Sequence, residues 1–382
     1  MNAQKIYIIF LILLSFGNGF AQNGKTIYLN PYTGNDSNAG SKDKPLKTLV
    51  AASRIVNDDA SNEAITIILS EGIYTINETS TFKPTQRTLT KTARLTIRAE
   101  ILPDDDNWNT SSMPTLIHTM QLSDWWQGQK DPFGGTGYGM MIETSHVTIQ
   151  GLKILGMPVV EHPKQGYIQR VYAIARLNPE FDDLEITQCF FAGDEVTNPN
   201  HLPIIANGNG IVLDHCMFYH VKQGIVYWSR NSTGHAMRNC LIIGNYGCGI
   251  WTSGIANDFD FRDNVIANGN YIWISQLTRD RGQQVIGEFS KSEPIHYKVY
   301  NSLFAGNKKF VGTGGGPALN FKDVDPAMLE LINSTVTDKP VELEMDQSKR
   351  NYLHPIAGSP AAEIRAGLFK KEHAEAETNK QK

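Results

Sequence analysis

Three short segments in the middle of the chain repeat one pattern: IVLDHCMF (211–218), HAMRNCLI (235–242) and FDFRDNVI (259–266). The fifth position of each segment is a polar hinge residue, and consecutive hinges are 24 residues apart. The hinges are His215, Asn239 and Asp263. Asn, Asp and Gly tolerate the left-handed backbone that a sharp bend requires. The pattern therefore predicts two short strands joined by a tight bend in each repeat.

Four further segments continue the same register in both directions along the chain. They are VTIQGLKI (147–154), LEITQCFF (184–191), YKVYNSLF (297–304) and LELINSTV (329–336), with hinges at Gly151, Gln188, Asn301 and Asn333. The seven successive hinges are 37, 27, 24, 24, 38 and 32 residues apart. A recurring unit with insertions of variable length is typical of a solenoid.

Two positions around the hinge are apolar in all seven segments. The position two residues before the hinge holds Ile149, Ile186, Leu213, Met237, Phe261, Val299 and Leu331. The position three residues after it holds Ile154, Phe191, Phe218, Ile242, Ile266, Phe304 and Val336. A third strand is predicted before the pair, at 139–145, 172–178, 224–230, 249–254 and 271–276. Because alternation gives each strand one inward face, we expect an all-β fold, a right-handed parallel β-helix.

Residues 1–21 are typical of a signal peptide. Lys5 is the only charge before an apolar run from Ile6 to Leu14, which is shorter than the roughly 20 residues that span a bilayer. Small residues precede an expected cleavage after Ala21. We therefore expect an exported protein, periplasmic or secreted, with no membrane span.

The mature chain is predicted to be one β-helix domain, 22–365, followed by a polar tail, 366–382. The segment Leu46–Val56 has helical periodicity and follows Pro45. Since a solenoid must cover its ends, this segment predicts an N-terminal cap helix.

Three of the four cysteines occur at the same position of the repeat. Cys189, Cys216 and Cys240 each follow a hinge, so stacked repeats would place them in one column. We interpret the column as a ladder of small buried residues, because parallel neighbours meet disulfide geometry poorly.

The net charge of the chain is slightly negative. Lys and Arg number 35 against 39 Asp and Glu, a formal charge of −4 that does not favour nucleic-acid binding. We expect a monomer.

Several motifs resemble pectate-lyase-like β-helix proteins over nearly the whole mature chain. They are IYLNPYTGNDSNAGS (27–41), KPLKTL (44–49), EGIY (71–74) and GSPA (358–361). The resemblance implies the β-helix fold and a carbohydrate-active protein, with a cleft along the outer face of the third strand and the turn before it. The superfamily includes polysaccharide lyases, glycoside hydrolases and non-catalytic spikes, so fold alone does not choose among them.

The sequence departs from two active sites of this superfamily. The aspartate cluster of calcium-dependent pectate lyases is absent from these strands, so no cofactor is identified and calcium use stays open. Only fragments of the polygalacturonase motifs are present, Gly234-His235-Ala236 and Asp182-Asp183, and His235 falls in an inward column. No metal-ligand spacing is present.

Candidate sugar-binding residues lie on the third strand. Alternation predicts Trp251 and Trp273 in one outward column, with Trp228 two places further along its strand, where indole faces could stack on sugar rings. Arg176 is also predicted to point outward, where its guanidinium could pair with a uronate carboxylate. The alternatives are that the Trp side chains fill the interior of the coil or pack under a loop, and that Arg176 makes a surface salt bridge. Two further candidate substrate contacts are Arg230 and Lys164.

Candidate catalytic residues lie in the turns before the third strand. The residues are His201, His220, Lys222 and Tyr246. Such side chains suit β-elimination, in which a base takes the C5 proton of a uronic acid and a cation neutralises the carboxylate while an acid protonates the leaving group at C4. We predict Lys222 or His220 as base, Tyr246 as acid and Arg176 as clamp. The alternative is that a short repeat merely exposes polar turn residues.

The leading hypothesis is therefore a polysaccharide lyase or oligosaccharide dehydratase that acts on uronic-acid-containing glycans. A glycoside hydrolase would need two carboxyl groups about 5–5.5 Å or 6.5–9.5 Å apart. Asp194 with Glu195, or Glu143 on the preceding third strand, are the candidates for such a pair. A non-catalytic glycan-binding solenoid is the third hypothesis.

Overall fold

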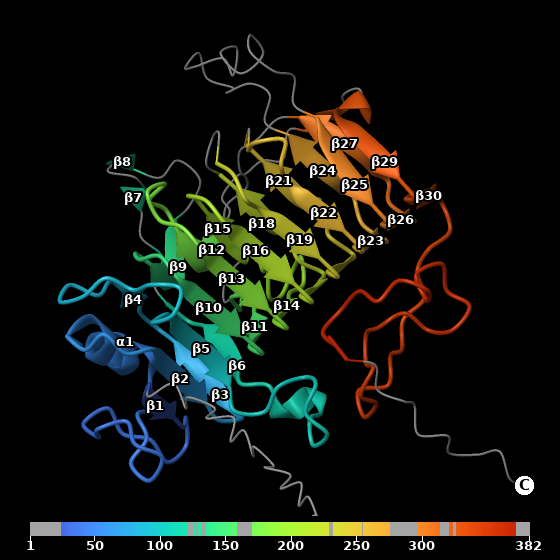
Figure 1. Cartoon of the computed structure of the whole chain (residues 1–382). Coiled ribbons are helices and arrows are strands. Elements are labelled where there is room, and N and C mark those ends of the chain that lie inside the picture. The colour runs from blue at the N-terminus through green and yellow to red at the C-terminus, as the bar shows by residue number, and fades with distance from the viewer. Residues whose placement is uncertain are drawn as a thin grey trace, which may run out of the picture.

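Three long sheets of parallel strands wind around one continuous core in the computed structural model (Figure 1). The structure describes residues 24–120, 122, 125–126, 129–130, 135–158, 170–228, 232–253, 255–275, 296–313, 321–323 and 326–371. The predicted signal peptide, Lys164 and Arg230 lie outside the described residues. The predicted parallel β-helix is confirmed.

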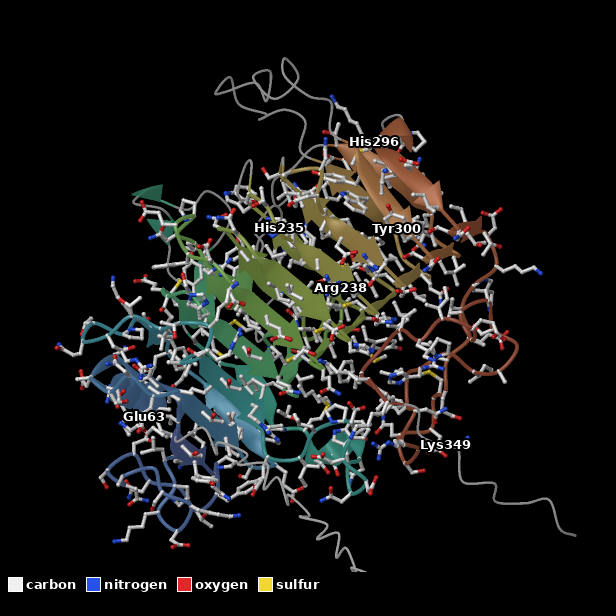
Figure 2. The ribbon with its side chains drawn as sticks, in the orientation of Figure 1. Glu63, His235, Arg238, His296, Tyr300 and Lys349 are labelled. Atoms are coloured by element: carbon white, nitrogen blue, oxygen red, sulfur yellow. The ribbon has the colours of Figure 1, made fainter. Side chains whose placement is uncertain are left out.

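The pre-hinge sheet contains the strand before each hinge. In spatial order its strands are β1 (Lys25–Leu29), β2 (Ile65–Leu69), β5 (Leu95–Ala99), β10 (Val147–Gln150), β13 (Leu184–Thr187), β16 (Ile211–Asp214), β19 (Ala236–Arg238), β22 (Asp260–Arg262), β25 (Tyr297–Tyr300) and β29 (Leu329–Ile332). The predicted inward column is in register from Ile149 to Leu331. The outer face is polar: Arg238 donates from Nε to Asp260 Oδ2 over 2.7 Å, and Tyr300 lies further along the sheet (Figure 2).

The post-hinge sheet contains the strand after each hinge. Its strands are β3 (Ile73–Ile76), β6 (Thr115–His118), β11 (Lys153–Leu155), β14 (Phe190–Ala192), β17 (Met217–Tyr219), β20 (Leu241–Ile243), β23 (Val265–Ala267), β26 (Leu303–Ala305) and β30 (Thr335–Thr337). The second predicted column is in register from Ile154 to Val336.

All seven predicted hinges have a left-handed backbone. Their φ angles are 75° at Gly151, 52° at Gln188, 51° at His215, 51° at Asn239, 55° at Asp263, 48° at Asn301 and 50° at Asn333. A single residue in this conformation turns the chain sharply from the pre-hinge to the post-hinge sheet. The hinge prediction is confirmed.

The third sheet completes each turn of the solenoid. Its strands are β4 (Ser80–Phe82), β9 (Thr136–Ile142), β12 (Arg170–Arg176), β15 (Ile204–Ala206), β18 (Gln223–Tyr227), β21 (Cys248–Thr252), β24 (Tyr271–Ser275), β27 (Lys309–Thr313) and β28 (Lys322–Asp323). Only β28 is antiparallel to its neighbour in this sheet, and it pairs with β27. A separate pair is formed by β7 (Trp125–Trp126) and β8 (Gln129–Lys130).

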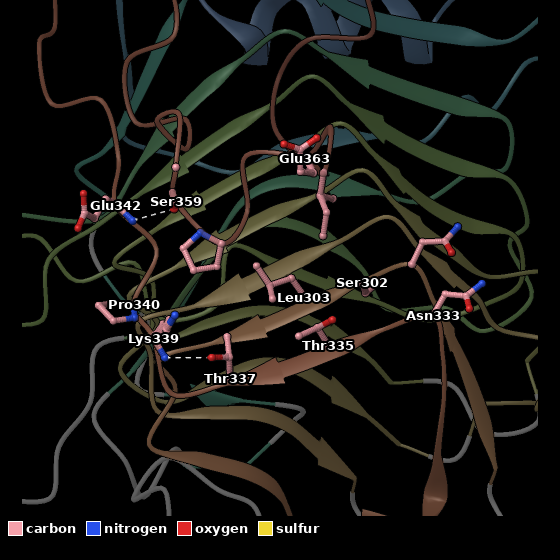
Figure 3. A pocket seen from close by; sticks show the side chains of 14 residues that line it. Ser302, Leu303, Asn333, Thr335, Thr337, Lys339, Pro340, Glu342, Ser359 and Glu363 are labelled. Atoms are coloured by element: carbon pink, nitrogen blue, oxygen red, sulfur yellow. Dashed lines mark hydrogen bonds between the residues drawn. The ribbon is translucent and has the colours of Figure 1, made fainter.

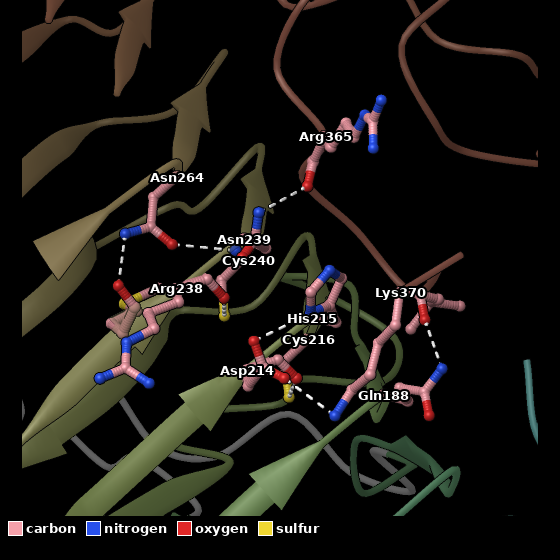
Figure 4. A network of polar contacts seen from close by, with 12 residues as sticks. Gln188, Asp214, His215, Cys216, Arg238, Asn239, Cys240, Asn264, Arg365 and Lys370 are labelled. Carbon is pink, nitrogen blue, oxygen red and sulfur yellow. Dashed lines mark hydrogen bonds and ion pairs between the residues drawn. The ribbon is translucent and has the colours of Figure 1, made fainter. Parts of the chain in front are cut away.

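The residues after the hinges form the expected ladder. Cys189, Cys216 and Cys240 are buried and have free thiols. Later rungs continue the column with hydrogen-bonding side chains: Cys240 N donates to Asn264 Oδ1 over 2.9 Å, as Figure 4 shows, and Asn264 N donates to Ser302 Oγ over 3.1 Å. The ladder therefore changes from packed sulfur to hydrogen-bonded amide and hydroxyl along the axis.

The N-terminal end is covered by α1 (Leu49–Asn57), which confirms the predicted cap helix. Thr48 caps it, since its Oγ1 accepts a hydrogen bond from Ala51 N over 3.2 Å. Asp36 fixes the approach to the helix by accepting hydrogen bonds from the Lys47 and Thr48 amides, both over 2.9 Å. Two short 3₁₀ turns, η1 (Thr110–Ser112) and η3 (Pro326–Met328), lie in connections.

The C-terminal segment 338–371 runs back over the outer face of the post-hinge sheet (Figure 1). Leu353, Ala366 and Leu368 are buried there in one apolar cluster with Met217 and Leu241. Polar contacts tie the segment to the hinges: Asn239 Nδ2 donates to Arg365 O over 3.1 Å, and Lys370 pairs with Asp214 over 2.9 Å (Figure 4).

Residues 366–371 therefore do not behave as the polar tail that the sequence suggests. Leu368 is buried, and the Phe369 ring lies 5.4 Å from the ring of Trp108. The backbone is also engaged, because Gln188 Nε2 donates to Leu368 O over 3.0 Å. The apolar side chains within this short stretch extend the packed structure beyond residue 365.

Candidate active site

The outer face of the third sheet carries a buried apolar cluster. Register places Val226, Trp251 and Ile274 in one outward column. Trp228 is half-buried and its ring lies 6.1 Å from that of Trp251, edge to face. The outward positions predicted for Trp228 and Trp251 are therefore found, but Trp251 is buried rather than exposed.

Trp273 was predicted to share the outward column, and this prediction is wrong. Trp273 pairs with Ile250 and is fully buried in the interior, where Nε1 donates to Thr252 Oγ1 over 3.0 Å. The cause is a local break in alternation, since the consecutive residues Ile272 and Trp273 both belong to the interior core. Trp273 is therefore not a sugar platform.

Arg176 also points inward, contrary to the prediction. In β12 the consecutive residues Ala173 and Ile174 both lie in the core, which shifts Arg176 onto the inward face. Its Nε donates to Asn207 O over 2.7 Å and its Nη2 to Asn209 O over 3.0 Å. Burial lowers the pKa of Arg176 to about 10. Arg176 therefore holds a turn of the scaffold and cannot clamp a substrate.

The turns that precede β15, β18 and β21 form one edge of the third sheet, here called the turn edge. On it, His220 is exposed and Lys222 is only 6% exposed, on either side of the fully buried Val221. Lys222 passes over Gly247 of the next rung: a Cβ at Gly247 would lie 3.2 Å from Lys222 Cγ and 2.6 Å from Lys222 O. The missing side chain at Gly247 makes room for the lysine.

Tyr246 lies one rung beyond Lys222, because its amide donates to Val221 O over 3.2 Å. Burial, and then the charges of Glu195 and Asp194, raise the pKa of Tyr246. The phenol is therefore protonated at neutral pH. Cys248 lies two residues after Tyr246. Burial raises the pKa of the Cys248 thiol, although the charge of Lys222 opposes this shift.

Two histidines also lie on the turn edge. The ring of exposed His220 stacks on Tyr219 at 4.2 Å, and the backbone φ of His220 is 52°. His201 precedes β15 and is buried. The turn edge thus brings His201, His220, Lys222 and Tyr246 onto three consecutive rungs, whereas Arg176 lies apart from them in the interior.

The carboxylates proposed for hydrolysis have other partners. Asp194 Oδ1 accepts hydrogen bonds from Thr197 N over 2.7 Å and Val196 N over 2.9 Å, which lower the pKa of Asp194. Glu143 pairs with Lys83 Nζ over 2.8 Å. Asp194 is therefore not poised to protonate a glycosidic oxygen, which requires a raised pKa, and Glu143 is engaged in an ion pair.

His235 is buried, as its inward position predicts, and it contacts Ser232. Its Nδ1 accepts a hydrogen bond from Ile211 N over 3.2 Å, so its other nitrogen, Nε2, carries the proton and donates to Ser232 Oγ over 2.7 Å. This tautomer cannot take a proton from the serine. The pair is therefore structural, and His235 directly precedes β19 (Figure 2).

The sequence patterns missed one polar group on the same face. Tyr271 Oη donates to Asp323 Oδ1 over 2.7 Å, and Lys309 Nζ pairs with Asp323 Oδ2 over 2.7 Å. Asp323 lies in β28, a two-residue antiparallel strand outside the repeat. No repeat register marks such a residue, so its position requires the structure.

A pocket of about 810 Å³ lies away from this face, between the last rungs of the post-hinge sheet and the C-terminal segment (Figure 3). Its lining residues include Thr335, Thr337, Lys339, Glu342 and Glu363, and none of the described lining residues is aromatic. The turn edge has both ionisable groups and neighbouring aromatic rings, so we place the candidate active site there.

Neither a metal centre nor a membrane-spanning helix is found in the part of the chain that the structure describes. There, no three His, Cys, Asp or Glu side chains are grouped so that they could hold a metal ion. Likewise, none of the described helices is long and apolar enough to cross a membrane.

Comparisons with known proteins support the fold. Residues 138–316 match the family model described as the right handed beta helix region. No curated protein matches the sequence.

Among solved structures, the chain is similar to a rhamnogalacturonan lyase (15% identity, TM-score 0.47, 74% of this chain and 68% of that chain). It is also similar to a lacto-N-biosidase from Eubacterium ramulus (10%, 0.44, 82% and 68%) and to a pectin methylesterase (11%, 0.45, 91% and 97%). From its three parallel sheets and the family model that matches residues 138–316, the chain has the fold of a right-handed parallel β-helix.

Proposed function

We propose that the protein is a carbohydrate-active enzyme that performs β-elimination on uronic-acid-containing glycans, as a polysaccharide lyase or an oligosaccharide dehydratase. The observation that carries this proposal is the course of Lys222 over Gly247, which puts this lysine and Tyr246, the residue before Gly247, on neighbouring rungs of the turn edge. Exposed His220 lies on the same turn as Lys222. These are the three kinds of group that elimination requires.

We assign separate roles to these residues. A lysine side chain is a compact cation that suits a uronate carboxylate, and an imidazole can accept a proton, so Lys222 is the cation and exposed His220 the base in this proposal. His220 takes the C5 proton while the C–H electrons form the C4–C5 double bond. The C4–O bond breaks, and Tyr246 gives its proton to the leaving oxygen. Solvent then restores both side chains.

The test is to incubate the mature protein with alginate, pectin, ulvan and glycosaminoglycan fragments and to follow the absorbance of unsaturated uronates. Tyr246→Phe and Lys222→Met should each lower the rate by roughly a hundredfold or more, in line with the loss of an acid or of charge stabilisation. Lys298→Gln and Tyr300→Phe, on the pre-hinge sheet, are matched controls and should retain the rate. No new absorbance with any of these glycans would refute the proposal.

Other outcomes identify the alternative functions. New reducing ends without unsaturation, lost in Asp194→Asn or Glu143→Gln, would indicate a glycoside hydrolase. Glycan binding that Trp251→Ala weakens, without turnover of any substrate, would indicate a binding solenoid. Because Asp194 and Glu143 already have hydrogen-bond and ion-pair partners, we rank hydrolysis below elimination as the proposed reaction.

A further inference from the structure

We propose that Tyr271, Lys309 and Asp323 form a second subsite that binds a neutral, hydroxyl-bearing sugar residue of the substrate. The inference rests on the proposed function, because it assigns a second residue of the same glycan. It implies a heteroglycan, with a uronate at Lys222 and a neutral sugar further along the chain.

The first observation is the fixed geometry of the three side chains. Tyr271 is 8% exposed, and its hydroxyl is held by one oxygen of Asp323. The other oxygen is held by Lys309, and the side chains of Lys309 and Asp323 are 48% and 58% exposed. A buried tyrosine thus orients a charged pair that solvent, and a ligand, can reach.

The second observation is the position of the group along the face. Register aligns Gln223, Cys248, Tyr271 and Lys309 in one column, and Lys222 directly precedes the first of them. With strands about 4.8 Å apart, Tyr271 lies about 10 Å beyond the rung of Lys222. A glycan that crosses the strands from the turn edge would therefore meet this group next.

The third observation is the aromatic wall beside the group. The Phe321 ring lies 5.4 Å from Tyr271 and 6.3 Å from Trp251, edge to face in both cases. Apolar ring surface together with donors and acceptors is suited to the two faces of a sugar ring.

The charges select the kind of sugar. Lys309 and Asp323 neutralise one another, so the three described side chains of the subsite carry no net charge that would attract a uronate carboxylate. Hydrogen bonds from Lys309 and then Tyr271 lower the pKa of Asp323, so that it is an ionised acceptor at neutral pH. An ionised carboxylate accepts hydrogen bonds from sugar hydroxyls and repels a second carboxylate. A neutral residue therefore fits better than a uronate.

The test measures binding by calorimetry on the full mature chain, with two sets of hexasaccharide-sized probes. Hyaluronan and ulvan fragments alternate uronate with another sugar, whereas oligogalacturonate and oligoalginate are all uronate. Asp323→Asn should weaken binding of an alternating probe by roughly tenfold or more, as expected for lost hydrogen bonds to a charged group, and should not weaken binding of all-uronate probes. Lys309→Gln should act in the same direction, and Asp338→Asn is the exposed control.

The outcomes separate this proposal from the proposed function. Binding that depends on Asp323, without any unsaturated product, would refute the elimination and retain the subsite. Elimination with unchanged affinities in folded Asp323→Asn and Lys309→Gln would refute the subsite alone. The subsite would also be refuted if the all-uronate probes bound more tightly than the alternating probes and lost this affinity in Asp323→Asn. It would be refuted as well if neither set of probes bound. Unchanged melting temperatures of both variants exclude a folding defect as the cause.

Discussion

At the residue scale, Gly247 is the position on which the candidate site depends most directly. A Cβ there would lie 2.6 Å from Lys222 O, which is too close, and 3.2 Å from Lys222 Cγ, which is a tight contact. Gly247→Ala should therefore destabilise the fold by about 1–3 kcal/mol, as overpacking does, and displace Lys222. Urea unfolding measures the first effect and the elimination assay the second.

The control for Gly247→Ala is Gly358→Ala. Unlike Gly247, Gly358 has a positive φ, 86°, and no described atom lies within 4 Å of its Cβ position. This variant should lose some stability through backbone strain and keep its activity. Equal loss of activity in both variants would argue against a special role for the space at Gly247.

The same scale shows how far the sequence could predict the site. His220, Lys222 and Tyr246 were predicted because a short repeat leaves little freedom in where its turns fall. Strict alternation predicts an outward position for Arg176 and Trp273. In β12, however, the consecutive residues Ala173 and Ile174 both face inward, and in β24 Ile272 and Trp273 both do. A local bulge of this kind is set by packing across rungs, which single-strand periodicity does not encode.

At the element scale, the left-handed hinge makes a separate prediction. Asn239 has a φ of 51° and its Nδ2 donates to Arg365 O over 3.1 Å. Asn239→Ala should cost about 1–2 kcal/mol for the left-handed backbone, plus the lost hydrogen bond. Asn239→Gly removes the same hydrogen bond without this backbone strain, so it should cost less. Urea unfolding of both variants tests the order, and a less stable glycine variant would contradict it.

The strands and hinges could be predicted because each is a local pattern repeated seven times. The C-terminal segment could not, since it does not share that repeat. Its apolar residues Leu353 and Leu368 find partners on a sheet far away in sequence, including Met217. The position of Asp323 could not be predicted for the same reason. Its hydrogen bond with Tyr271 joins a residue outside the repeat to a residue within it.

At the scale of the whole molecule, the solenoid is closed by different means at its two ends. Helix α1 covers the first rungs, and the inward residues Leu331 and Val336 of the last rung remain 37% and 52% exposed. The C-terminal segment does not cap this end but returns along the side to residues 104–108, where Arg350 lies 5.5 Å over the Trp108 ring. It therefore links the last rungs to the first ones.

Three buried histidines predict how the stability of this assembly depends on pH. Burial lowers the pKa of His118, His235 and His354 from 6.5 to about 4. In the unfolded chain they take up protons near pH 6.5, whereas the folded chain resists protonation until about pH 4. Their contribution to stability is therefore complete above pH 6.5 and is lost as the pH falls from 6.5 to 4, by on the order of 3 kcal/mol per histidine.

A carboxylate effect would appear in a different pH window. Hydrogen bonds from Lys25, Ser61 and Arg87 outweigh burial and lower the pKa of Asp59 from 3.8 to about 2, so its contribution is lost only below about pH 4. Urea unfolding between pH 7 and 4 should thus show a steep fall that the histidines cause. His354 Nε2 accepts a hydrogen bond from Leu368 N over 3.1 Å, and His354→Gln should lower stability at pH 7 and flatten this fall. A free energy of unfolding that stays constant from pH 6.5 to 4 would show that these histidines are not buried in their neutral form.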